Sequence, residues 1–205
     1  MRAKGFVVAL IGALVMVTVS GCGSSPPSDF FIMTPMAGAD ARQATAPGRE
    51  PLSVGVGPVK IPDYLNRAQI VTRAGPNRLD VNEFHRWGGA FTSNLSQVIA
   101  QNLSVILGTD DVFVFPSDDP LPPAYRVTVS FTQLDGALGE SVLLDARWTI
   151  TGSKGDKQLA AARSVVREAT NGGDYADYVA AQSRALEKLS REIAARIKQL
   201  LEAGD

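Results

Sequence analysis

The stretch "YRVTVSFTQLDGALGESVLLDARWTI" (residues 125–150) decides the fold. Its two halves alternate apolar and polar residues, and the apolar positions are Tyr125, Val127, Val129 and Phe131, then Val142, Leu144, Ala146, Trp148 and Ile150. A period of two is typical of strands that have one face on a core and the other toward water. "GSKGD" (152–156) then makes a tight turn, and 157–169 returns as a less regular strand. The sequence therefore predicts three consecutive antiparallel strands.

Segments with helical periodicity lie on both sides of these strands. Asp80 followed by Glu83 resembles a capping box, and the apolar spacing that follows predicts a helix over about 82–107, ending at Gly108. Gly88 and Gly89 inside that helix cost about 1 kcal/mol each relative to Ala, which close packing can offset. Asp174 is predicted to cap a second long helix, whose apolar stripe is Tyr178, Leu186, Leu189, Ile193, Ile197 and Leu200.

Shorter strands are predicted around the first helix, at 28–34, 52–61, 68–73 and 111–116, with a turn at 74–77. Two amphipathic helices each need an apolar sheet face to cover. The predicted fold class is therefore α+β, with a single mixed, largely antiparallel sheet and two long helices packed on one face.

The N-terminus has the form of a secretory signal. Arg2 and Lys4 precede an uncharged fourteen-residue apolar run (6–19), which is shorter than the roughly 20 residues that a membrane-spanning helix needs. The following "VSGC" resembles the bacterial lipobox, in which the cysteine is acylated and becomes the new N-terminus. We therefore expect residues 1–21 to be a lipoprotein signal peptide, Cys22 the lipidation site, 22–27 a tether and 28–205 one domain. The alternative is an ordinary cleaved signal beside an incidental cysteine.

Composition limits the possible functions. Residues 1–21 hold two of the 20 Lys and Arg and none of the 21 Asp and Glu, so residues 22–205 carry a net charge of −3. A nucleic-acid-binding domain would carry a basic face, so we do not expect this protein to bind nucleic acid. With a single cysteine and a single histidine, the chain has no disulfide and no Cys/His zinc site.

No arrangement of catalytic residues stands out. His85, the one histidine, is predicted to lie off the apolar stripe of the first helix. "GVGP" (55–58) lacks the third glycine and the following helix of a phosphate-binding loop. We therefore expect a protein that is not an enzyme and has no cofactor or metal, apart from the covalent lipid on Cys22.

Three segments carry a resemblance to a known family: 25–35, "VGVGPVKIPDYLNRAQIVTRAGPNRLDVNEFHRW" (54–87) and "NLSVILGTDDVFVFP" (102–116). Together they resemble the ABC-type transport auxiliary lipoproteins, the PqiC-like family. Asn66 and Ala68 depart from the commoner family pattern, in which Asp and Pro are frequent at these positions.

The resemblance implies an outer-membrane lipoprotein on the periplasmic face. Its implied partner is an inner-membrane MCE-domain protein that forms a tube across the periplasm and moves lipids between the membranes, which maintains envelope integrity. It also implies a homo-oligomeric ring. Gly23, rather than Asp, after the cysteine favours sorting to the outer membrane by the same resemblance. A periplasmic lipid-binding shuttle is the alternative, and it would need an apolar cavity.

The segment "IPDYLNRAQIVTR" (61–73) is the predicted subunit or partner interface. It concentrates Tyr64, Arg67, Gln69 and Arg73 without a strict burial pattern. Tyr and Arg are enriched at interfaces and their hot spots. The alternative is that Tyr64 closes a turn and the arginines are solvated.

Overall fold

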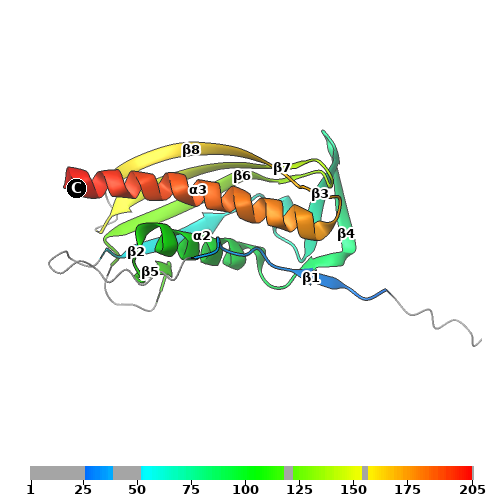
Figure 1. Ribbon diagram of the computed structural model, residues 1–205, viewed down its shortest axis with the longest axis horizontal. Helices are drawn as coiled ribbons and strands as arrows, with labels where there is room; N and C mark the ends of the chain where they lie inside the picture. The colour runs from blue at the N-terminus through cyan, green and yellow to red at the C-terminus, as the bar shows by residue number, and fades with distance from the viewer. Residues whose placement is uncertain (1–25, 39–51, 118–121, 154–156, 205) are drawn as a thin grey trace, which may run out of the picture.

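The structure is a computed structural model that describes residues 26–38, 52–117, 122–153 and 157–204. Its main body is a five-stranded sheet in the order β5-β2-β6-β7-β8 (Figure 1). The strands are β2 (Val54–Lys60), β5 (Val112–Val114), β6 (Tyr125–Gly136), β7 (Ser141–Gly152) and β8 (Gln158–Ala169). β6, β7 and β8 are antiparallel, whereas β2 runs parallel to both β5 and β6. The predicted antiparallel strands are confirmed, and so is the mixed sheet.

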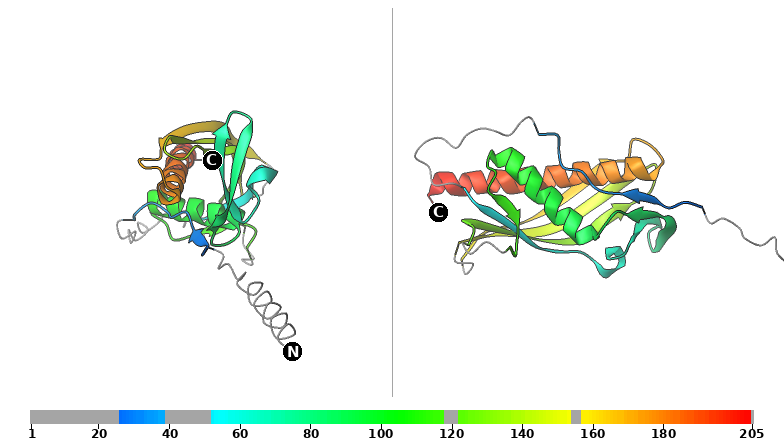
Figure 2. Two further views of the ribbon diagram at one scale, coloured as in Figure 1. Left: turned by 90° about the vertical axis from the view of Figure 1, so that its right-hand side faces the viewer. Right: turned by 90° about the horizontal axis from the view of Figure 1, so that it is seen from below.

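Two long helices cover one face of this sheet. These are α2 (Phe91–Leu107) and α3 (Tyr175–Ala203), which pack against the sheet and against each other (Figure 2). The alternating apolar residues predicted for β6 and β7 are all buried beneath them, as is the predicted stripe of α3. The α+β class and the placement of both helices on one face are confirmed.

The remaining strands form a second, three-stranded sheet in the order β1-β4-β3, where a single sheet was predicted. Its strands are β1 (Asp29–Phe31), β3 (Gln69–Gly75) and β4 (Arg78–Trp87), and a short 3-10 helix η1 (Asp63–Leu65) precedes β3. β1 pairs parallel with the end of β4, and β3 and β4 form a hairpin. This sheet stands at the end of the molecule where α3 begins (Figure 1).

The predicted start of the first helix was wrong by nine residues. Arg78–Trp87 is a strand, so Asp80 and Glu83 form no capping box and His85 lies in β4. Gly88, Gly89 and Ala90 are exposed and connect the strand to the helix, which begins at Phe91. The two glycines break the helical pattern because glycine is a poor helix former. Phe91 remains on the buried stripe, which explains why the apolar spacing looked continuous.

The predicted end of the first helix and the predicted cap of the second agree with the structure. Gly108 ends α2 in the left-handed conformation, and its backbone N–H donates to the Ser104 carbonyl. The Asp174 side chain accepts from the backbone N–H of Asp177 and caps α3. "GVGP" lies within β2, where Gly57 has a φ of +143° and an added Cβ would lie 2.0 Å from the Phe115 carbonyl oxygen. Those glycines therefore serve strand packing in this fold.

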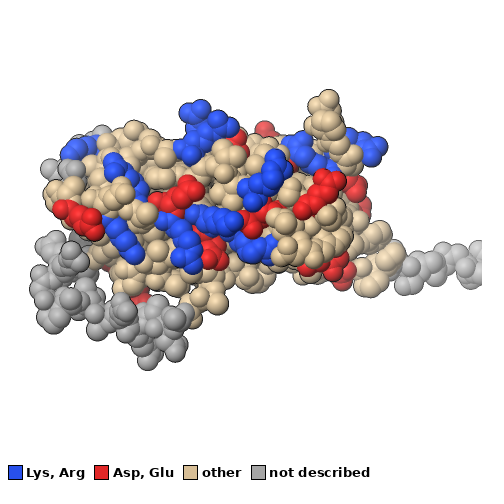
Figure 3. Space-filling model, turned by 45° about the horizontal axis from the view of Figure 1, so that its top comes forward, with Lys and Arg blue, Asp and Glu red and all other residues tan. Residues whose placement is uncertain are grey.

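The surface that carries α3 has mixed charge. Basic and acidic side chains are interspersed along it (Figure 3). Arg191 pairs with Glu187 at 2.7 Å, and Glu168 on β8 pairs with both Arg184 and Lys188. The cations of these pairs are exposed, whereas Glu168 is buried, and the mixture of signs leaves no extended field of one sign on this face.

Candidate functional site

The two sheets meet at a buried tyrosine. Tyr178 of α3 is fully buried, and its hydroxyl donates to the Val71 carbonyl of β3 at 3.0 Å. The same oxygen accepts from the backbone N–H of Gly136 at the end of β6, at 3.1 Å. Burial raises the pKa of Tyr178, so the hydroxyl keeps its proton. One side chain thus joins α3 to both sheets.

A buried carboxylate lies beside this joint. The β6–β7 pairing shifts between Phe131 and Gln133, where β6 carries one residue more than β7. Such a bulge reverses the alternation of the strand, so Leu134 continues the buried face and Asp135 points to the other side. The Asp135 side chain is 0% exposed.

Three side chains donate to this carboxylate. Tyr64 Oη lies 2.5 Å from Oδ2, and Gln133 Nε2 lies 2.7 Å from Oδ1. Arg73 makes a two-point contact, with Nε at 2.6 Å from Oδ1 and one terminal nitrogen at 3.2 Å from Oδ2. A buried charge needs this degree of pairing, since an unpaired one is strongly destabilising. We refer to Tyr64, Arg73, Gln133 and Asp135 as the Asp135 cluster.

Proton affinities follow from these contacts. Burial raises the pKa of Tyr64 to about 12, and its hydrogen bond to Asp135 acts in the same direction. The hydrogen bond to Asp135 also raises the pKa of Arg73. At neutral pH both groups are therefore fixed donors. A protonated phenol and a permanent guanidinium offer positioning, and neither acts as a general base.

The four predicted interface residues are only partly brought together. Tyr64 and Arg73 both turn inward to Asp135, so the alternative in which Tyr64 has a structural role gains support. Gln69 donates to Glu83 of the neighbouring strand at 3.1 Å. Arg67 is exposed between η1 and β3, and its side chain has no partner among the described residues. It is the member of the set that is free to contact another molecule.

Sequence reasoning missed Asp135 and Gln133. Asp135 opens "DGALGE", which looks like an ordinary turn. The one available signal was Leu134, an apolar residue out of phase with Phe131, which indicates a bulge in an otherwise strict alternation.

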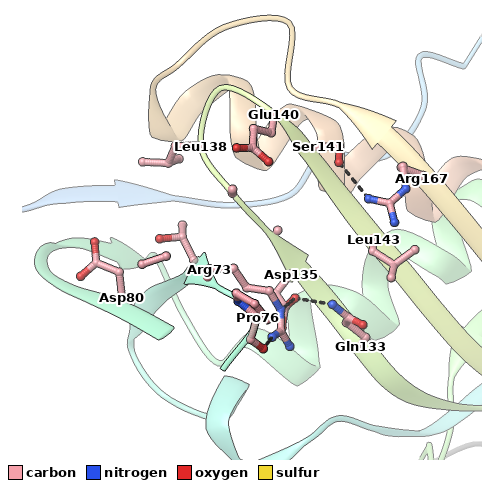
Figure 4. Close-up of a pocket in the computed structure, with 15 residues that line it drawn as sticks. Arg73, Pro76, Asp80, Gln133, Asp135, Leu138, Glu140, Ser141, Leu143 and Arg167 are labelled. Carbon is pink, nitrogen blue, oxygen red and sulfur yellow. Dashed lines mark hydrogen bonds and ion pairs between the residues drawn. The ribbon is translucent and has the colours of Figure 1, made fainter. Parts of the chain in front are cut away.

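A pocket of about 750 Å³ opens next to the Asp135 cluster (Figure 4). The ends of β3, β6, β7 and β8 line it together with the β6–β7 turn and Asp80 of β4. Its charged residues are Arg73, Asp80, Asp135, Glu140 and Arg167, and Arg167 donates to the Ser141 hydroxyl at 3.1 Å. This lining offers donors and acceptors to a polar group such as a polypeptide loop.

The His85 side chain packs against aromatic rings. Its ring stacks on Tyr175 with centroids 4.0 Å apart and lies 6.0 Å from the Phe31 ring. Nδ1 is 3.0 Å from Asn82 Oδ1, and Nε2 is 3.6 Å from an Asp29 oxygen. No group of three His, Cys, Asp or Glu residues within the described ranges is placed to hold a metal ion. The predicted signal peptide, Cys22 and most of the tether lie outside those ranges.

Comparison with known proteins places this arrangement in a family. The model of the ABC-type transport auxiliary lipoprotein component family matches residues 35–194, which include α2, most of α3 and every described strand except β1. The chain belongs to this family. The predicted family is confirmed, and with it the description as a lipoprotein and an auxiliary transport component.

Solved structures share the fold of this family member. A crystal structure described as an uncharacterized protein superposes with a TM-score of 0.66 at 17% identity, covering 84% of this chain and 99% of the other. A protein of Xanthomonas campestris from the family model DUF330 gives 0.60 at 14% identity, covering 88% and 99%. No curated protein matches the sequence. Among the described residues, no helix is long and apolar enough to cross a membrane.

Proposed function

We propose that the protein is an outer-membrane lipoprotein subunit of an MCE-type intermembrane lipid transport system. In this role it is a non-catalytic ring or docking component at the outer-membrane end of a periplasm-spanning conduit, and it contributes to envelope integrity. The family match, which begins only thirteen residues after the lipobox Cys22, carries this proposal. An acyl anchor and a transport-auxiliary domain on one short chain fix the domain close to a bilayer.

The surface beside the Asp135 cluster suits a docking role. Tyr64 and Arg73 tie the segment 61–73 to the buried end of β6, which gives the loop between them a defined shape. Arg67 projects from that loop with no partner among the described residues. Rigid presentation of an arginine lowers the entropic cost of binding and is typical of hot spots. We propose Arg67 as the subunit contact, with Tyr64 and Arg73 as its support.

The shuttle alternative requires a cavity for acyl chains. The pocket beside the Asp135 cluster is lined by five charged side chains, which would have to lose water against a lipid tail. Its chemistry suits a polar loop of a partner or of a second subunit. The docking role is therefore the better supported of the two.

Two measurements test this proposal. Wild-type chain should fractionate with the outer membrane, whereas Cys22→Ser should not. The soluble form starting at Gly23 should give a defined multiple of the protomer mass by light scattering. Arg67→Ala should shift that form toward monomer without lowering the melting temperature of the monomer itself, because the Arg67 side chain has no partner among the described residues.

Arg196→Ala is the matched control for the mass measurement. Arg196 is an exposed arginine of α3 whose described contact is Gln199, and its loss should leave the assembly intact. A wild-type chain that stays monomeric at all concentrations would argue against the ring. Outer-membrane localisation that survives Cys22→Ser would argue against the anchor.

A further inference from the structure

The three-stranded sheet exposes an apolar face. Phe30 and Ile32, at the β1 edge, are 66% and 60% exposed, and Phe84 of β4 is 40% exposed. The opposite face of the same strands packs inward, where Phe31 and His85 lie against Tyr175. We call Phe30, Ile32 and Phe84 the β1 face.

The residues of the β1 face pack against neighbouring residues of β4 and of the chain that follows it, so they are not isolated apolar side chains on the surface. Phe30 lies opposite Arg86 in the parallel pairing, and Ile32 lies over Gly88, where an added Cβ would be 3.1 Å from its Cγ2. The glycine leaves room for Ile32 to lie on the strand end. An exposed apolar edge strand is a liability in water unless something covers it.

An arginine accompanies this face. Arg86 is half-buried beside Phe30, and its side chain has no partner among the described residues. Arginine keeps its charged head in water while its stem covers apolar surface, and it pairs well with phosphate. Apolar side chains next to an available arginine match the acyl-to-phosphate boundary of a phospholipid leaflet.

The position of the β1 face along the chain also favours contact with a phospholipid leaflet. Phe30 is only eight residues from Cys22, so an extended chain separates them by at most about 29 Å. β1 also lies at the end of the domain where α3 begins, with β3 and β4 (Figure 1). This face therefore lies within a short reach of the leaflet that would hold the anchor.

We propose that Phe30, Ile32 and Phe84 insert into the interfacial region of the phospholipid leaflet that carries the acyl anchor, with Arg86 at the level of the phosphates. This inference rests on the proposed function, because it requires acylated Cys22. It adds a second point of membrane contact that fixes the orientation of the domain. A single point of attachment would leave that orientation free.

The test uses the acylated full chain, purified from membranes and placed in vesicles of phosphatidylethanolamine and phosphatidylglycerol. Acylation occupies the sulfur of Cys22, which is the only cysteine, so Ile32→Cys introduces a single free thiol for an environment-sensitive fluorophore. Lipids with a spin label near the headgroup should quench this probe several-fold more strongly than a probe at Val165→Cys. Val165 is a matched control, since it is 59% exposed on the distant strand β8.

Asp29→Cys separates true insertion from mere closeness to the anchor. Asp29 is one residue nearer to Cys22 than Phe30, but it pairs with His85 on the opposite face of β1. Weak quenching at position 29 and strong quenching at position 32 are expected. Equal quenching at positions 29 and 32, or at 32 and 165, overturns the inference.

Two further outcomes have distinct meanings. A probe at position 32 that is already shielded in detergent, at concentrations where the chain self-associates, assigns the β1 face to a second copy and overturns membrane insertion. Intact mass without acyl chains, with a second label on Cys22, removes the proposed anchor as well as the inference. Acylated protein with no preferential quenching removes the inference alone.

Discussion

At the scale of single residues, Asp135 is the side chain on which the candidate interface depends. Its buried carboxylate accepts from Tyr64, Arg73 and Gln133, which come from η1, β3 and β6. Two of the four residues predicted from sequence as contacts are thereby assigned a supporting role. The sequence indicated that the segment was unusual in composition, but the partner of its charges is 62 residues away from Arg73 along the chain.

Asp135→Asn should destabilise the fold by about 3 kcal/mol, because it removes one charge of a largely buried pair and leaves the other in place. Urea unfolding at neutral pH measures this change. Asp145→Asn is the control, since Asp145 pairs with the more exposed Arg163 at 2.6 Å, and it should cost less than about 1 kcal/mol. Equal losses for the two variants would show that burial of Asp135 is unimportant.

Tyr64→Phe should make the free energy of unfolding less dependent on pH in the alkaline range. The pKa of Tyr64 is raised from 10.0 to about 12 by folding. A raised pKa means that its stabilising contribution is complete below the unfolded value and is lost as the pH approaches the folded value. The difference in unfolding free energy between wild type and Tyr64→Phe should therefore shrink between about pH 9 and pH 12. A difference that stays constant over this range would contradict the assignment.

At the scale of elements, the boundary between β4 and α2 shows what local pattern can and cannot give. The turn at 74–77 was predicted, and a β-hairpin after it would have assigned 78–87 to a strand. Phe84 and Trp87 nevertheless continue the helical spacing of α2. The strand signal is weak because Glu83 and His85 are polar where the alternation begun by Leu79 and Val81 would place apolar residues. Pairing with β1 and β3 decides the outcome, and such pairing is invisible in a local window.

Substitutions at the N-caps of the two helices should change the stability of the protein in opposite directions. Ala90 occupies the N-cap of α2 in an extended conformation and offers no side-chain acceptor, so Ala90→Ser should stabilise the protein by about 0.5–1 kcal/mol. Asp174 caps α3 through Asp177, so Asp174→Ala should cost about 1 kcal/mol. Thermal unfolding at equal protein concentration measures both variants. A loss of stability in Ala90→Ser would show that this N-terminus is satisfied in another way.

At the scale of the whole molecule, the class and the covered face were predictable, whereas the division into two sheets was not. The residues of β6, β7 and α3 that face the core are apolar because they are buried, so their spacing can be seen in the sequence. The joint depends on Tyr178, which was predicted only as an apolar stripe residue. Its hydroxyl also bonds to Val71, 107 residues away, and to Gly136. Hydrogen bonds of such long range leave no mark in the sequence pattern.

The central claim is that this lipoprotein is a docking subunit of an MCE-type transport system. Affinity purification of the acylated full chain from gently cross-linked, solubilised envelopes, followed by protein identification, tests it most directly. The account predicts recovery of an inner-membrane MCE-domain protein. The yield should fall in Arg67→Ala, which weakens the contact between subunits of the docking ring, and should be unchanged in Arg196→Ala. An acylated, outer-membrane-located chain that recovers no MCE-domain protein under these conditions would contradict the claim.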